Sequence, residues 1–316
     1  MENESKYYRP ESVDDAQEIA YRLESNFRYI AGGTDLMVNR YQGNETSANL
    51  IDLTGIPELN QISKSEKHLS IGSLVRLEEI RKNPELEKEF PVVCNAAMSV
   101  GSPLIRKWAT IGGNILCENR CIYYNQSEWW RESVGYCLKC DGSICIATGS
   151  KKYCYSEFVS DTAPALISVD AMVEIVDNGA SKVVRLEDIY TGDGTQPRNL
   201  RSTAIIRSIL LPLSSGYKSV FKKLRIRKSL DFTSLTTAVS VSCSGRLKIA
   251  AGGVDPKPVV VEGTVKSNKD ELIAKVLSKS RAINNEMFTR KYRREMIRTF
   301  LSSSFEELGV GVSAEY

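Results

Sequence analysis

The sequence predicts an α+β fold built from three consecutive parts. The chain has 316 residues, enough for two or three structural units, and its 42% hydrophobic and 26% charged residues are close to globular averages. Short strand-like runs alternate with helical patterns, and no long polar or Pro/Gly-rich tract separates them. We therefore expect a small parallel β/α unit over residues 1–57, a larger mixed-sheet unit over 58–213, and a C-terminal α+β unit over 214–316 with a small antiparallel sheet and helices.

The first unit begins with a helix and continues with two strands. Ser12 is a suitable cap for a helix through "SVDDAQEIAYRLE", in which apolar residues recur at helical spacing. The run "FRYIAGGTDL" predicts a strand that ends at Gly32-Gly33, and a turn or helical segment then leads to a second strand in "NLIDL". This order predicts a small β-turn-α-β unit.

The second unit should place helices over a sheet. Ser73 is a plausible cap for a helix that holds Leu74, Leu77 and Ile80. Beyond a cysteine-rich stretch, strands are expected in "AMVEIV", "KVVRL" and "AIIRSILLPL". Pro212 and "SSGY" predict a boundary.

The third unit should combine a sheet with two helices. Strands are expected in "SVFKKLRIRKSL", "SLTTAVSVSC" and "RLKIAAGGV". The basic segment "FTRKYRREMIRTFL" predicts an amphipathic helix with Phe288, Tyr292, Met296 and Phe300 on one side. A solvated helix face explains its basic residues better than a phosphate-binding patch does.

Charge and hydropathy argue against nucleic acid and membrane partners. The 42 basic and 39 acidic residues give a net charge of +3, too small to imply a polyanionic partner. The N-terminal residues lack the apolar core of a secretory signal, and no apolar run is long enough to span a bilayer. We expect a cytoplasmic protein, in which thiols stay reduced.

Two segments share a glycine pattern, "IAGGTDL" from Ile30 to Leu36 and "ATIGGNI" from Ala109 to Ile115. In each, an apolar strand is expected to end at paired glycines that permit positive φ, so that backbone N–H groups can point at one anion. Ordinary tight turns are the alternative for either segment alone. The segment "GDGTQP" lacks the third glycine of a dinucleotide fingerprint, and the single histidine, His68, lies in a polar stretch that predicts a surface position. We expect no catalytic residue.

Six of the eight cysteines lie between Cys117 and Cys154. In a reducing compartment such a group favours a metal centre or redox chemistry over disulfides. The pair in "CLKC", Cys137 and Cys140, could help to hold zinc, and Cys117 offers another thiol. The remaining two, Cys94 and Cys243, lie in apolar patterns that predict core positions.

Five motifs occur in an order that resembles a known family: "AGGTDL", "ATIGGN", "SDTAPAL", "KKLRIRKSLD" and "IAAGGV". The chain resembles the FAD-binding medium subunit of the molybdenum hydroxylase family, which includes xanthine dehydrogenases and aerobic carbon monoxide dehydrogenases. The likeness extends from about Tyr8 to the last helix. It implies that the 1–57 and 58–213 units together form an FAD-binding domain.

The resemblance also implies site residues. The first glycine segment would hold the FAD pyrophosphate, and the second would contact the phosphate and ribityl region of FAD. The implied residues are Tyr29, Ile30, Ala31, Gly32, Gly33, Thr34, Asp35, Leu36, Thr110, Gly112, Gly113 and Asn114. Asp161 would hydrogen-bond the cofactor, and Lys223 would lie near the isoalloxazine, where a cation stabilises a reduced flavin. Without the resemblance, Asp161 could cap the turn at "DTAP" and Lys223 could be one more exposed lysine.

The cysteine-rich stretch, at about 117–158, is an insertion relative to most of the family. It resembles one branch, the medium subunit of 4-hydroxybenzoyl-CoA reductase, which has an added [4Fe-4S] cluster and a run like "RCIYYNQSEWWR". That likeness implies four cluster ligands, Cys121, Cys137, Cys145 and Cys154. Zinc, and ligation by Cys117 or Cys140, stay open as alternatives. Five basic residues could offset the cluster's negative charge: Arg120, Arg131, Lys139, Lys151 and Lys152.

The resemblance implies an electron-transfer subunit. A molybdenum cofactor and [2Fe-2S] clusters would belong to a large and a small partner subunit, as a dimer of heterotrimers. Our main hypothesis is that a donor such as ferredoxin feeds electrons through the cluster and FAD toward molybdenum, where an aromatic acyl-CoA is reductively dehydroxylated. The alternative is a hydroxylase subunit, in which FAD passes electrons from a xanthine, aldehyde or N-heterocycle outward to an acceptor. A third hypothesis is a scaffold that binds FAD only for stability.

Overall fold

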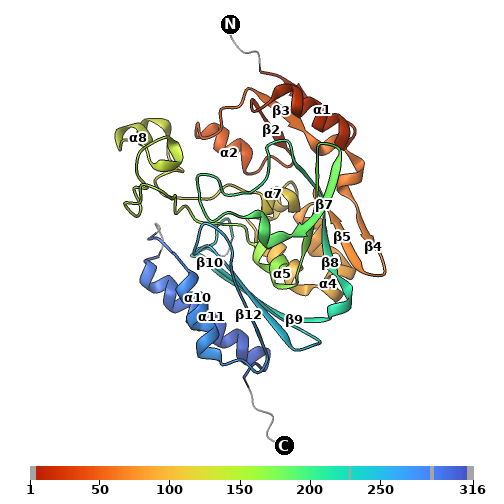
Figure 1. The fold of residues 1–316 in the computed structure, drawn as a ribbon, viewed down its shortest axis with the longest axis vertical. Helices are drawn as coiled ribbons and strands as arrows, with labels where there is room; N and C mark the ends of the chain where they lie inside the picture. The colour runs from red at the N-terminus through yellow and green to blue at the C-terminus, as the bar shows by residue number, and fades with distance from the viewer. Residues whose placement is uncertain (1–4, 228, 285–287, 312–316) are drawn as a thin grey trace, which may run out of the picture.

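The computed structural model describes residues 5–227, 229–284 and 288–311. Lys228 of the basic motif and the tail from Val312 therefore lie outside the described residues. Three sheets succeed one another along the long axis, with the first near the N-terminal end and two long helices near the C-terminal end (Figure 1). The α+β fold class is confirmed. The exact unit boundaries remain a prediction.

The first sheet is parallel, in the order β1-β3-β2, with β1 at Tyr7–Tyr8, β2 at Phe27–Ile30 and β3 at Asn49–Asp52. Helix α1 (Val13–Leu23) starts where predicted, because Ser12 Oγ accepts a hydrogen bond of 3.1 Å from Asp15 N. The short helix α2 (Leu36–Tyr41) follows the glycine turn. Two 3₁₀ turns, η1 (Leu53–Gly55) and η2 (Pro57–Asn60), lead into the second sheet.

The second sheet is antiparallel, in the order β4-β5-β8-β6-β7. Its strands are β4 (Ile62–Lys64), β5 (His68–Gly72), β6 (Met172–Asp177), β7 (Ala180–Arg185) and β8 (Ile205–Pro212). The helices of this unit are α3 (Leu77–Lys82), α4 (Pro84–Glu89), α5 (Pro91–Ser99), α6 (Pro103–Arg106), α7 (Ile111–Ile115) and α9 (Thr162–Ser168), with the 3₁₀ turn η4 (Leu186–Ile189). The predicted cap at Ser73 is wrong: α3 begins at Leu77, because Ser73 is held by backbone bonds to Arg207 and Gly112.

The third sheet is antiparallel, in the order β12-β11-β10-β9. Its strands are β9 (Tyr217–Leu224), β10 (Leu235–Ser242), β11 (Arg246–Gly252) and β12 (Val259–Thr264), after the 3₁₀ turn η5 (Leu213–Ser215). Helices α10 (Lys269–Lys279) and α11 (Arg290–Glu307) cover it. Cys243 is exposed, so its predicted core position is wrong; β10 ends at Ser242 and Cys243 enters the turn.

The buried face of α11 agrees only in part with the predicted one. Arg293, Ile297, Leu301 and Phe305 face the core, whereas Tyr292 is exposed. The Arg293 guanidinium is buried with Glu157 and donates hydrogen bonds to the backbone carbonyls of Gly253, Ile283 and Ser234, so a cation occupies a core position. Phe288, Met296 and Phe300 are partly buried against the same core, so only Tyr292 of the predicted apolar side is wrong.

The cysteine-rich insertion contains little regular structure. A short helix, α8 (Glu128–Ser133), and the 3₁₀ turn η3 (Leu138–Cys140) interrupt an irregular chain. This segment extends to the side of the molecule, next to α2 (Figure 1). Within the described ranges, no helix combines the length and apolar character that a membrane crossing requires.

Candidate cofactor site and cysteine cavity

The two glycine segments lie against each other. A Cβ at Gly32 would overlap the carbonyl oxygen of Trp108, which leads directly into the second segment. Gly33 has a φ of +68°, the left-handed conformation expected of such a turn. The backbone N–H groups of Gly32, Gly33 and Thr34 donate to no acceptor in the part of the chain that the structure describes. Adjacent unpaired N–H groups fit an anionic group such as a pyrophosphate.

The second segment differs from the prediction, because Gly112 and Gly113 lie inside helix α7 instead of in a turn after a strand. Thr110 Oγ1 caps this helix by accepting from Gly113 N at 3.1 Å. A Cβ at Gly112 would lie 2.8 Å from the Cβ and backbone oxygen of Ser73, so glycine is needed for close packing. Neither glycine of α7 has positive φ.

The remaining residues of the first segment are partly buried in and after β2: Tyr29, Ile30, Ala31, Thr34, Asp35 and Leu36. The Tyr29 hydroxyl donates to Thr203 O at 3.0 Å, and burial raises its pKa. Its side chain thus joins the first sheet to the segment before β8. Any contact of Tyr29 with a cofactor would have to come from its backbone or ring.

Asn114 connects α7 to the Ser-Asp-Thr-Ala-Pro motif. Its Oδ1 accepts from Ser160 Oγ at 2.8 Å and from Thr162 Oγ1 at 2.6 Å. Thr162, to which the sequence assigned no role, therefore holds the glycine helix in place.

Asp161 and Lys223 form one buried ion pair. Lys223 Nζ lies 2.6 Å from Asp161 Oδ2 and donates to the carbonyls of Ser99 and Asp231, and its side chain is only 4% exposed. Thr236 Oγ1 donates to the other carboxylate oxygen at 3.0 Å, while burial raises the pKa of Asp161 against the effect of Lys223. Asp161 makes no capping bond and Lys223 is not exposed, so both alternative interpretations are wrong.

The four predicted ligand cysteines line a single small cavity. The lining residues are Cys121, Tyr123, Tyr124, Cys137, Leu138, Lys139, Cys145, Ile146, Ala147 and Cys154. Neither Cys117 nor Cys140 is among them. Over residues 5–227, 229–284 and 288–311, no three His, Cys, Asp or Glu side chains are placed so that they could hold a metal ion. The cavity nevertheless assembles four thiols from well-separated parts of one loop.

The thiols influence one another's ionisation. Burial raises the pKa of Cys121 to about 12, and Cys154, Cys137 and Cys145 add to this effect. A hydrogen bond from Cys140 lowers the pKa of Cys137 to about 6 and raises that of Cys140. Several thiols thus share one local field, the condition under which a bound cation would favour thiolates.

A loop that the sequence did not connect with the cysteines forms part of their surroundings. Asp193 Oδ1 accepts from Cys154 N at 3.0 Å, and Gly194 N donates to Cys154 O at 2.9 Å. A Cβ at Gly194 would overlap Ser156 Oγ and lie 2.7 Å from Cys154 Sγ. The "GDG" of "GDGTQP" was the available signal, but its contact partner lies about forty residues earlier in the chain.

Ion pairs connect the cysteine cavity to the glycine turn. The Asp35 carboxylate accepts from Glu118 N and pairs with Arg120, whose guanidinium lies 4.7 Å from the centroid of the Phe232 ring. The Glu118 carboxylate pairs with both Arg198 and Lys139. These two cations outweigh its burial and lower the pKa of Glu118 to about 2.

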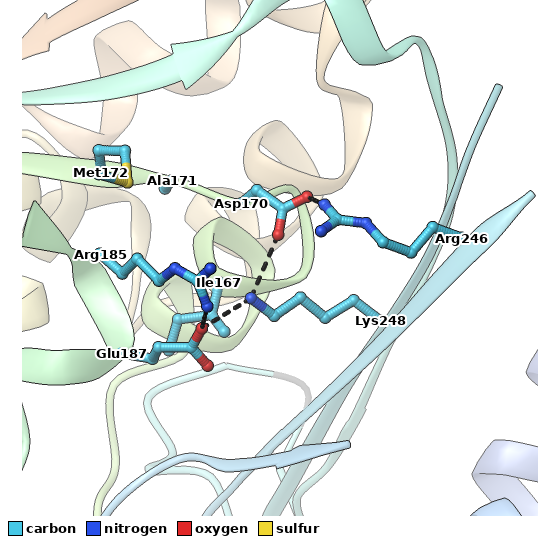
Figure 2. Close-up of a pocket in the computed structure, with 8 residues that line it drawn as sticks. All are labelled: Ile167, Asp170, Ala171, Met172, Arg185, Glu187, Arg246 and Lys248. Atoms are coloured by element: carbon cyan, nitrogen blue, oxygen red, sulfur yellow. Dashed lines mark hydrogen bonds and ion pairs between the residues drawn. The ribbon is translucent and has the colours of Figure 1, made fainter. Parts of the chain in front are cut away.

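A second hollow lies between the second and third sheets. Figure 2 shows Lys248 between the carboxylates of Asp170 and Glu187, at 3.2 and 2.8 Å, with Arg246 and Arg185 on their outer sides. Each charge shown there has a partner of opposite sign. We interpret the ion pairs in this hollow as contacts that hold the second and third sheets together.

Known proteins resemble the chain in both sequence and fold. Residues 3–214 match the family described as FAD binding domain in molybdopterin dehydrogenase. The FAD-binding subunit of an aldehyde oxidoreductase from Escherichia coli is 30% identical over 245 residues, covering 74% of this chain and 77% of the relative. The medium chain of glyceraldehyde dehydrogenase from Sulfolobus acidocaldarius is 25% identical over 96% of this chain and 98% of the relative.

Among solved structures, carbon monoxide dehydrogenase from Oligotropha carboxidovorans superposes with a TM-score of 0.76 at 18% identity, covering 99% of this chain and 100% of that chain. Quinoline 2-oxidoreductase from Pseudomonas putida gives a TM-score of 0.72 at 16% identity, over 97% and 98% of the two chains. These structures support the fold. Together with the family match, they lead to one conclusion: the chain belongs to the FAD-binding domain family of the molybdopterin dehydrogenases and is the FAD-binding medium subunit of a molybdenum-dependent oxidoreductase.

Proposed function

We propose that this subunit carries electrons outward, from a molybdenum site on a partner subunit, through FAD, to an external acceptor. The relatives that support this direction include an aldehyde oxidoreductase subunit, a glyceraldehyde dehydrogenase chain and a nicotinate dehydrogenase FAD-subunit. An aldehyde or an N-heterocycle would be oxidised on the partner. This alternative hypothesis from the sequence fits the relatives better than reductive dehydroxylation does.

The proposal requires FAD on this chain, and the observation that supports FAD binding is the contact between the two glycine segments. The unpaired N–H groups of Gly32, Gly33 and Thr34 would bind the FAD pyrophosphate, and the close contact of Gly32 with Trp108 O brings the start of the second segment to the same turn. Thr110 and Asn114 would orient α7 through the bonds already described. FAD supplies the one- and two-electron chemistry.

The ion pair of Asp161 and Lys223 would border the flavin ring. Lys223 is fixed by three oxygen partners, so its charge has a defined place. A fixed cation near the flavin would favour its anionic reduced form and raise its potential. Because both side chains are buried, we assign them to orientation and electrostatics instead of to proton transfer.

We further propose a [4Fe-4S] cluster on Cys121, Cys137, Cys145 and Cys154. The support is the single cavity that these four side chains line, to the exclusion of Cys117 and Cys140. One thiolate for each iron is the ligand set of a cubane cluster. Zinc bound through Cys137 and Cys140 is the competing assignment.

The same cavity favours a second candidate function. A cluster at this place would extend the electron path beyond FAD, and a low-potential donor such as ferredoxin could then drive electrons inward, to dehydroxylate an aromatic acyl-CoA on the molybdenum subunit. The cysteine-rich insertion is the specific observation behind this candidate. For either direction we propose a cytoplasmic complex with a large molybdenum subunit and a small [2Fe-2S] subunit, arranged as a dimer of heterotrimers.

A reductive titration of the complex separates these functions. The complex is purified anaerobically and titrated with dithionite while flavin absorbance and the iron–sulfur EPR signal are followed. A cluster potential above that of FAD supports outward flow, and one far below it supports inward flow. A flavin that does not bleach would leave only the scaffold hypothesis.

A further inference from the structure

We propose that Lys139 sets the reduction potential of the centre held by the four cysteines, acting as a positioning charge with Glu118 and Arg198. This inference rests on the proposed iron–sulfur cluster and names the chain's own residues that would control it. Sequence alone left five basic residues as equal candidates, and the geometry selects one.

Lys139 is the only charged side chain among the described residues that line the cysteine cavity. It is 5% exposed, so its ammonium group is shielded from water and acts at reduced dielectric. Nζ donates to Gly194 O at 2.7 Å and to Glu118 Oε2 at 3.0 Å, and lies 4.9 Å from the centroid of the Tyr124 ring. Three contacts thus hold one positive charge beside the thiols.

The charge is not cancelled by its carboxylate partner. Glu118 divides its two oxygens between Arg198 and Lys139, so the triad carries two positive charges and one negative charge, a net +1. A nearby positive charge stabilises the state with the additional electron, and local charge is one of the determinants of cluster potential. Lys139 should therefore raise the potential.

The other basic residues of the insertion are either paired with carboxylates or exposed to solvent. Arg120 pairs with Asp35, and Arg131 is buried among the carbonyls of Gln42 and Gln126 and the Glu128 carboxylate. Lys151 and Lys152 are exposed, where solvent screens their charge. None of these four lines the cavity.

The test measures the cluster's midpoint potential by EPR-monitored titration of the anaerobic complex. Three variants are compared with wild type: Lys139→Met, which removes the charge; Glu118→Gln, which leaves Lys139 and Arg198 without a counter-charge; and Lys151→Met, a matched exposed control. The proposal predicts a more negative potential for K139M, a more positive one for E118Q, and no change for K151M. A merely structural role would not produce shifts of opposite sign.

Each of the other possible outcomes also supports or overturns the role of Lys139. If K139M fails to retain iron, a positive shift in E118Q still supports the proposal, and its absence overturns it. Equal potentials in all four proteins overturn the role of Lys139 while the cluster itself stands. Wild-type complex without iron overturns the cluster and this inference together, which distinguishes the two failures.

Discussion

Cys140 and Cys145 differ in their relation to the cavity, although they are only five residues apart. Cys145 lines it and Cys140 does not. We expect Cys145→Ser to remove most of the cluster iron, because a cubane needs each of its thiolates. Cys140→Ser should retain wild-type iron and acid-labile sulfide, and it serves as the matched control. Iron loss in C140S with retention in C145S would contradict the ligand set.

Gly194 supplies a second prediction at the scale of single residues. Its missing side chain leaves the space that Ser156 Oγ and Cys154 Sγ occupy. Gly194→Ala should displace Cys154 and reduce the bound iron per chain by half or more, whereas Gly149→Ala should not. Gly149 has φ +76°, but its Cβ would meet no atom within 4 Å, so it controls for backbone strain without a clash. Equal iron content in the two variants would show that Gly194 does not shape the cavity.

The ion pair between Asp35 and Arg120 connects two elements, the glycine turn before α2 and the first residues of the insertion. Arg120→Gln leaves the Asp35 carboxylate without its cation beside the proposed pyrophosphate site. We expect about tenfold weaker FAD binding, equivalent to ~1.4 kcal/mol, because an unpaired carboxylate repels the phosphates. Flavin retention during dialysis measures this effect, with Lys151→Gln as control. Unchanged affinity in R120Q would separate the insertion from FAD binding.

At the scale of elements, alternating apolar residues predicted the strands well. Runs such as "AMVEIV" and "AIIRSILLPL" became β6 and β8, and Ser12 capped α1. One helix start failed because tertiary bonds hold Ser73, and the pattern did not predict that the cation of Arg293 occupies a core position on α11. The local sequence pattern cannot predict these contacts, because the partner residues are distant in sequence.

The roles of the site residues remain a prediction. The resemblance identified the four cysteines and the two glycine segments, and the structure places those cysteines around one cavity and those segments in contact. The resemblance did not indicate that Asp161 and Lys223 bind each other, or that Asp193 and Gly194 adjoin Cys154. Each of these pairs joins residues that only the folded chain brings together.

For the whole molecule, Lys248 connects the second and third sheets (Figure 2). Burial lowers the pKa of Lys248, but bonds to Glu187 and Asp170 outweigh this and raise it, so its ammonium group keeps its charge at neutral pH. Lys248→Met leaves two carboxylates facing each other and should destabilise the fold by about 3 kcal/mol. Urea unfolding at pH 8 measures this, with exposed Lys182→Met on β7 as control. Equal urea midpoints for K248M and K182M would show that Lys248 does not hold the two sheets together.

We propose that one chain holds FAD on its paired glycine segments and an iron–sulfur cluster on four cysteines. Flavin and metal analysis of the anaerobically purified complex is the decisive measurement. We expect one FAD and about four iron atoms for each copy of this chain, after the iron of the partner subunits is subtracted. Zinc in place of that iron, or a chain that retains flavin with no iron of its own, would contradict it.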